Sequence, residues 1–207
     1  MVYLLTIFIC SVIIYIPNAI ANVSHSDKPW LYYFLAVVIY IAASVAVDGL
    51  VAFIIRRLPA KWMNPKKGMI LTRDWEYKLY DKIHVASWKR FMPDLGMFTK
   101  FQKGKLTDPM NNEYIGRYIL EGCYGVVIHY MSVPFSALVL LLGLIEPNNL
   151  ATWTVGVPVM VVNMVLILLP ALTLKYNLPK LVRVYDMNLR IMARRAEKEK
   201  QDSIKEN

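Results

Sequence analysis

Basic residues are almost absent from four long apolar stretches of this chain, and no other feature constrains its fold as strongly. Of the 24 Lys and Arg residues, 14 lie between Arg56 and Arg117, and nine lie from Lys175 to the C-terminus. Hydrophobic residues make up 57% of the 207-residue chain, whereas an ordinary soluble domain has about 45–50%. A net charge of +9 that is sorted in this way is typical of an integral membrane protein with a basic cytoplasmic face.

Each apolar stretch is long enough to cross about 30 Å of hydrocarbon as a helix that rises about 1.5 Å per residue. The four stretches are Val2–Ala21, Trp30–Ile55, Tyr118–Ile145 and Ala151–Leu174. They predict an all-α integral membrane protein with four transmembrane helices. A cleaved signal peptide is the rival interpretation of the first stretch, because Ala19-Ile20-Ala21 resembles a cleavage site. Since no Lys or Arg precedes that stretch, an uncleaved helix is favoured.

The distribution of charge also predicts the topology. The short links between the first and second stretches and between the third and fourth contain one basic residue, Lys28. We therefore expect a multi-pass protein of the cell membrane with both termini in the cytoplasm. The predicted organisation is helices 1 and 2 in residues 1–55, a cytoplasmic interfacial loop in 56–117, helices 3 and 4 in 118–174, and a cytoplasmic tail in 175–207.

The long loop is rich in aromatic residues that alternate with Lys and Arg, as suits a segment at head-group depth. Its aromatic residues include Trp62, Trp75, Tyr77, Tyr80, Trp88, Phe91, Phe98 and Phe101. Leu71 to Lys82 fits either a helix or a strand. From Pro179 to about Lys200, apolar residues share one face opposite basic residues, which predicts an amphipathic helix. Anionic membrane lipids or a phosphate-bearing substrate, rather than nucleic acid, are the expected partners; the oligomeric state stays open.

Two ionisable residues of the third stretch are the first candidates for chemistry. Glu121 precedes His129 by eight residues, which corresponds to about 12 Å along a helix and to neighbouring faces. Gly125 lies between them and leaves room for a substrate or another helix. An ionisable side chain in a membrane span is costly and marks function by default, and an imidazole there can act as a general base toward a hydroxyl. Alternatively, His129 only bonds a neighbouring helix.

Other polar residues in the spans admit both structural and functional interpretations. Asp48 either takes part in the chemistry or caps or kinks its helix. Asn18 and Asn163 are expected to form hydrogen bonds between helices. The two cysteines, Cys10 and Cys123, indicate neither a disulfide framework nor a metal site. We therefore expect no metal and no cofactor.

Three segments in order resemble one family of enzymes. Residues 88–100 read W-K-x-x-x-P-x-x-G-x-F-x-K, Glu121 and His129 follow, and residues 176–181 read Tyr-Asn-Leu-Pro-Lys-Leu. This order is similar to that of the glycosyl-4,4'-diaponeurosporenoate acyltransferases, small bacterial membrane enzymes that place a fatty acyl chain on a sugar hydroxyl of a glycosylated carotenoid. The resemblance covers roughly residues 75–190. The chain has Tyr124, Val126, Lys175 and Leu178 where the family usually has charged residues (Arg, Glu, Arg and Arg).

The resemblance implies a membrane acyltransferase that moves a fatty acyl group from an acyl-CoA or acyl-carrier thioester to a hydroxyl of a glycolipid or lipid-linked acceptor. It implies that His129 and Glu121 are catalytic. The implied substrate-binding residues are Lys89, Lys100, Lys175 and Arg183 for phosphates, Trp88, Phe98 and Tyr176 at the entrance, and Asn177. A non-catalytic partner that binds anionic lipid or a cytosolic protein is the alternative. A membrane methyltransferase is less favoured, because no R-H-P-x-Y-like segment precedes a span.

Overall fold

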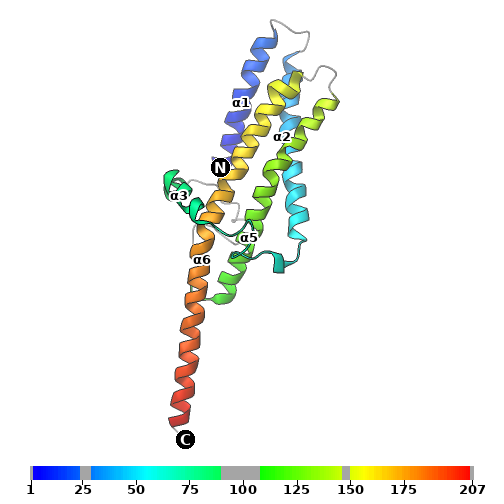
Figure 1. Cartoon of the computed structure of the whole chain (residues 1–207). Coiled ribbons are helices and arrows are strands. Elements are labelled where there is room, and N and C mark those ends of the chain that lie inside the picture. Colours follow the sequence, from blue (N-terminus) through cyan, green and yellow to red (C-terminus); the bar gives the residue numbers. More distant parts are fainter. Residues whose placement is uncertain (1, 24–28, 90–107, 146–149, 206–207) are drawn as a thin grey trace. The chain divides into compact units, whose positions relative to one another are not determined.

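The computed structural model describes residues 2–23, 29–89, 108–145 and 150–205, and every regular element in these residues is helical (Figure 1). The elements are α1 (Val2–Val23), α2 (Trp30–Arg56), the 3₁₀-helix η1 (Ala60–Trp62), α3 (Asp74–Lys82), α4 (Val85–Trp88), α5 (Asn112–Phe135), the 3₁₀-helix η4 (Ser136–Leu144), the π-helix η5 (Thr152–Gly156) and α6 (Val157–Lys205). The predicted all-α class is confirmed, and the segment from Leu71 to Lys82 is helical from Asp74 onward.

Three helical segments of the described residues are long and apolar enough to cross a membrane. They are Trp30–Arg56, Asn112–Leu144 and Thr152–Asp202, so the chain is a multi-pass membrane protein. Helix α1 contributes a shorter apolar segment, Leu5–Ala21. A fourth crossing and the cytoplasmic position of both termini stay predictions.

The chain divides into two compact units. Unit 1 comprises the described residues among 1–58 and 127–172, and unit 2 comprises those among 59–89, 108–126 and 173–205. Helices α5 and α6 each contribute residues to both units. The predicted organisation into helices, interfacial loop and tail stays a prediction.

Unit 1 is packed around Tyr40 of α2. Apolar side chains of α2, η4, η5 and α6 form its core: Tyr33, Ala36, Val37, Tyr40, Val139, Ala151, Val155 and Val159. The Tyr40 hydroxyl and Thr152 Oγ1 are 2.9 Å apart and share a hydrogen bond. A Cβ atom at Gly156 would lie 2.6 Å from the Tyr40 ring, so the π-helix can approach α2 only because this residue is glycine.

A side chain from α1 compensates for a proline near the start of α6. Pro158 has no N–H to donate to the carbonyl four residues earlier, which is that of Thr154. The side-chain amide of Asn18 donates to this carbonyl, with an Nδ2–O distance of 3.0 Å. The prediction that Asn18 forms a hydrogen bond between helices is therefore confirmed.

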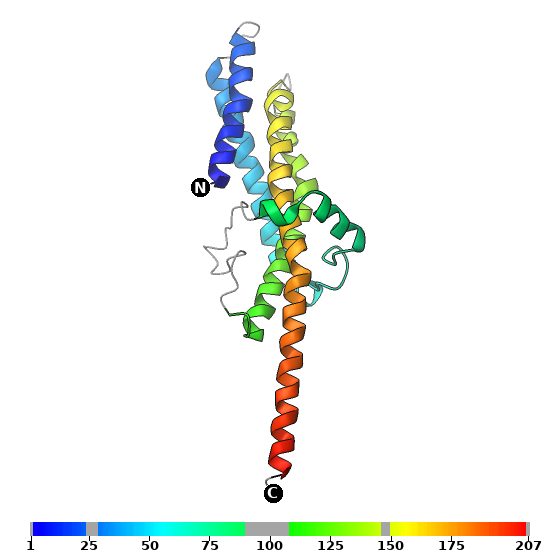
Figure 2. The same cartoon turned by 90° about the vertical axis from the view of Figure 1, so that its left-hand side faces the viewer.

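The same arrangement occurs at Pro179 in unit 2. Helix α6 continues through this proline without a break (Figure 2), although the amphipathic pattern predicted that a separate helix begins there. Pro179 removes the N–H donor for the carbonyl of Lys175. The Thr72 hydroxyl donates to that carbonyl at 2.9 Å, and Thr72 is buried. A side chain distant in sequence thus keeps α6 continuous.

Helices α5 and α6 approach each other closely in unit 2. A Cβ atom at Gly122 would lie 2.9 Å from Leu178, and one at Gly125 would lie 2.7 Å from Leu174. The room that Gly125 was expected to leave is therefore filled by a neighbouring helix. Leu178, at one of the positions where the chain departs from the resembled family, is 2% exposed.

Candidate functional site

A buried ion pair joins α3 to α6 in unit 2. Lys175 Nζ donates to Glu76 Oε1 at 2.5 Å, and the two side chains are 7% and 5% exposed. The other carboxylate oxygen of Glu76 accepts the backbone N–H of Arg73 at 2.7 Å, at the N-terminus of α3. Because breaking such a pair leaves a buried, uncompensated charge, Glu76 fixes α3 against this part of α6.

The next two residues of α6 are held by the same packing. The Tyr176 ring meets Tyr80 of α3 edge to face, with centroids 5.9 Å apart. Asn177 accepts a hydrogen bond from Lys89 Nζ through its Oδ1 atom at 2.9 Å. The geometry thus brings together three of the predicted substrate-binding residues, Lys89, Tyr176 and Asn177.

Two lysines meet at the Tyr176 ring. Lys89 Nζ lies 4.9 Å from the ring centroid, and Lys180 Nζ lies 3.8 Å from it. Partial burial lowers the pKa of Lys89 below the usual 10.5; the nearby positive charge of Lys180 lowers it further, and Tyr176 opposes the shift. Tyr176, Asn177 and the two lysines are called the lysine cluster below.

The turn between α3 and α4 positions Lys89. His84 adopts a left-handed backbone conformation (φ 53°, ψ 43°), which is uncommon for a residue other than glycine. The chain then enters α4, and the indole N–H of Trp88 donates to the carbonyl of Ile83 at 2.9 Å. Trp88 is half-buried, and its hydrogen bond fixes it against this turn. Lys89 directly follows Trp88, so the turn also sets the position of Lys89.

The two predicted catalytic residues lie on one continuous helix, α5. Glu121 and His129 are both half-buried. Glu121 belongs to unit 2 and His129 to unit 1. Their assembly into one site stays a prediction.

The family model for glycosyl-4,4'-diaponeurosporenoate acyltransferase matches residues 59–187, more than half of the chain. The chain belongs to this family. No curated protein and no solved structure matches it.

Within this acyltransferase family member, the predicted substrate-binding residues have different surroundings. Lys175 is enclosed in its ion pair with Glu76, which favours a positioning role over direct contact with a substrate. Arg183 is exposed on α6, seven residues and about two turns after Tyr176 and therefore on the same face. Phe98 and Lys100 lie outside the described residues.

Sequence reasoning missed three residues of the acyltransferase that the structure places at or next to the lysine cluster. Lys180 belongs to the segment that resembled the family, and its spacing of four residues from Tyr176 on a helix was the available signal. Glu76 and Thr72 had no such signal, because their partner Lys175 lies 99 and 103 residues away.

A polar cluster also lies inside unit 1 of the acyltransferase. Asn163 Nδ2 of α6 donates to Asp48 Oδ2 at 3.2 Å and to Ser136 Oγ at 3.3 Å, which confirms Asn163 as a residue that bonds between helices. Asp48 therefore faces the bundle. Ser132 lies beside Asp48, yet its hydroxyl and Asp48 Oδ1 have no hydrogen bond of ordinary geometry to any described residue. A catalytic role for Asp48 stays untested.

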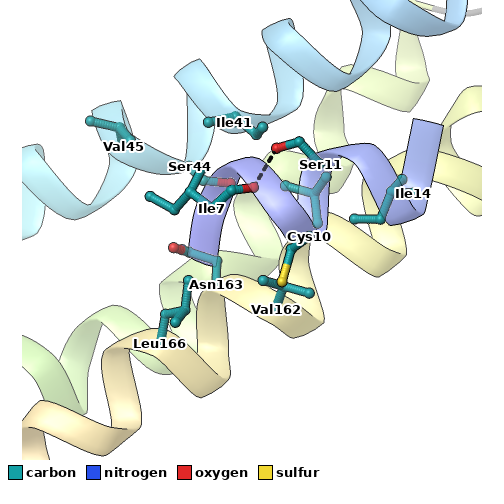
Figure 3. A pocket seen from close by; sticks show the side chains of 11 residues that line it. Ile7, Cys10, Ser11, Ile14, Ile41, Ser44, Val45, Val162, Asn163 and Leu166 are labelled. Carbon is teal, nitrogen blue, oxygen red and sulfur yellow. Dashed lines mark hydrogen bonds between the residues drawn. The ribbon is translucent and has the colours of Figure 1, made fainter. Parts of the chain in front are cut away.

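Figure 3 shows a small cavity next to this cluster. Its volume is about 40 Å³, and its walls come from α1, α2 and α6. Ser11, Ser44 and Asn163 are its polar members, while Cys10 and Ile14 are among the other residues that α1 contributes (Figure 3). The space suits part of an apolar chain or a water molecule rather than a whole substrate.

A larger cleft of about 430 Å³ lies in unit 2, among residues 60–66, α5 and α6. Met63, Ile119 and Val182 contribute apolar walls, and the ion pair of Lys66 with Asp186 (3.2 Å) lies along it. Its volume falls in the range of about 300–1,000 Å³ that is typical of ligand sites. Neither this cleft nor the smaller cavity is lined by Glu121 or His129.

The described residues contain no group of three or more His, Cys, Asp or Glu side chains that could hold a metal ion.

Proposed function

We propose that this protein is a membrane acyltransferase that moves a fatty acyl group from a thioester donor to a hydroxyl of a glycolipid or lipid-linked acceptor. The family match over residues 59–187 carries the reaction class. The helices long and apolar enough to cross a membrane support an acceptor that is itself a lipid. The family's name points to a glycosylated carotenoid as the acceptor. The proposal covers the wider class of glycolipid and lipid-linked acceptors.

In the proposed reaction, His129 acts as the general base. It accepts the proton of the acceptor hydroxyl, whose oxygen attacks the thioester carbonyl carbon. The carbon–sulfur bond then breaks, and the proton passes from His129 to the departing thiolate, so that the products are an ester and a free thiol. Glu121 orients the imidazole or stabilises its protonated form. General bases of this kind contribute about 10²–10⁴-fold to the rate.

Support for His129 comes from its place on an apolar helix and from its half-buried side chain. An ionisable residue at membrane depth is retained mainly where it has a function.

The test compares lipid extracts of cells with and without the protein by mass spectrometry, followed by assay of the purified protein with an acyl thioester. We expect an acylated glycolipid to disappear when the protein is removed. His129→Ala should lower turnover about 100-fold or more. His84→Asn is the matched control, since it removes another described histidine and Asn tolerates the left-handed backbone.

Two results would contradict the proposal. An unchanged lipid profile would favour the non-catalytic partner that binds anionic lipid. A His129→Ala protein that inserts normally and retains full turnover would remove His129 from the mechanism, even if acyl transfer itself were observed.

A further inference from the structure

The lysine cluster carries more positive charge than its surroundings compensate. The Nζ atoms of Lys89 and Lys180 lie 4.9 Å and 3.8 Å from one ring centroid. They are therefore within about 9 Å of each other, comparable to the Debye length at physiological salt, so that each experiences the charge of the other. Among the described residues, neither lysine forms an ion pair with a carboxylate.

The carboxylate of Glu76, which belongs to the same packing, already has partners. Glu76 is paired with Lys175 and also accepts the backbone N–H of Arg73. Asn177 offers Lys89 only a neutral oxygen, and Tyr176 offers only the face of its ring, which attracts cations weakly in comparison with an anion. Two ammonium groups so arranged gain stability when an anion binds between them.

The Tyr176 ring and the helix that bears Lys180 are held in place before any ligand binds. Tyr80 packs edge-on against Tyr176. Thr72 keeps α6 helical across Pro179, so Lys180 stays one turn from Tyr176. A site whose frame is already ordered loses less conformational freedom on binding.

We propose that Lys89, Lys180 and the Asn177 amide form an anion site that holds a phosphate group at the edge of the Tyr176 ring. Phosphate suits the site because its several anionic oxygens can accept from two ammonium groups and an amide N–H at once. Arg183, on the same face of α6, extends the positive charge outward from the site.

Two classes of ligand could supply this phosphate group. Its assignment to the acyl donor rests on the proposed function. One is a nucleotide-linked thioester of the coenzyme A type, which carries several phosphates. The other is the head group of an anionic phospholipid. Both ligands present a phosphate group to the site, and binding measurements distinguish between them.

The experiment uses the full chain in nanodiscs of zwitterionic phospholipid and measures the dissociation constant of coenzyme A. Lys180→Gln and Lys89→Gln should each raise that constant about 5–10-fold and reduce its dependence on salt. Lys198→Gln is the matched control, because it removes one exposed lysine from the same helix and should change nothing. Lys180→Glu, which reverses the charge at an exposed position, should weaken binding most.

A second arm measures binding of the detergent-purified protein to vesicles with and without phosphatidylglycerol. If the lysine variants weaken vesicle binding and leave coenzyme A binding unchanged, the phosphate comes from a lipid head group and the anion site stands. If the variants match the Lys198 control in both arms, the proposal is overturned. These results are independent of His129→Ala turnover, so the anion site and the acyl-transfer mechanism can fail separately.

Discussion

Replacing Thr72 with valine should test whether its hydroxyl holds α6 together across Pro179. Valine retains the shape of threonine and removes the donor. The carbonyl of Lys175, to which the hydroxyl donates at 2.9 Å, would be left without a donor from either Pro179 or residue 72. Removing the hydrogen-bond donor to a buried carbonyl costs about 1–3 kcal/mol.

For a chain of this size, each kcal/mol corresponds to about 2–4 °C in the midpoint of thermal unfolding. We therefore expect Thr72→Val to lower the midpoint of the detergent-purified protein by about 2–12 °C. Tryptophan fluorescence is a suitable signal, because Trp62, Trp75 and Trp88 all belong to unit 2. Thr72→Ser retains the hydroxyl and is the control, with an expected loss much smaller than that of valine.

A double-mutant cycle isolates the proposed cause. Pro179→Ala restores the backbone N–H that can donate to the Lys175 carbonyl, so Thr72→Val should cost clearly less in that background. Equal losses for the valine and serine variants, or an unchanged cost of Thr72→Val when Pro179 is replaced, would refute the reasoning. The loss would then come from packing of residue 72 and not from the repair of α6.

Three other predictions concern the packing and charge of each unit. Glu76→Gln should lower the free energy of unfolding by about 3–5 kcal/mol, because it removes the negative charge that Lys175 faces in this buried pair; an unchanged thermal midpoint would contradict this. Gly156→Ala should destabilise by about 1–3 kcal/mol by forcing a methyl group into the Tyr40 ring, whereas Gly49→Ala, with no atom within 4 Å of its new Cβ, should be neutral or stabilising in the same unfolding assay. Anion affinity should fall as pH rises through the pKa of Lys89, which lies below 10.5, since only the charged form binds; a Lys89→Arg protein should show no such early fall in a titration with coenzyme A.

The parts of the fold that depend on local composition were predictable. Hydropathy alone located the spans at Trp30–Ile55 and, in outline, those that begin near Tyr118 and Ala151, because an apolar helix is decided by consecutive residues. Asn18 and Asn163 were correctly expected to bond between helices, since an amide in an apolar segment has few other partners.

The parts that depend on distant partners were not predictable. Pro179 was read as the start of a new helix, because the donor that replaces its N–H comes from Thr72. The charge on Lys175 looked available for a phosphate, although Glu76 neutralises it from a segment 99 residues away. Gly125 was expected to leave room for a substrate or another helix, and the sequence could not decide between them; Leu174 of α6 occupies the space. In each case the missing information was the identity of the neighbour across the helix interface.

The side chains that bond to the carbonyls left without a donor by Pro158 and Pro179 of α6 have a consequence for how such chains can diverge. Thr72 and Pro179 act as a matched set, as do Asn18 and Pro158, so that neither member is free to drift alone. A relative that has lost the hydroxyl or the amide should also have lost the corresponding proline. Substitutions at these four positions are therefore expected to covary across the family, independently of any selection exerted by a substrate.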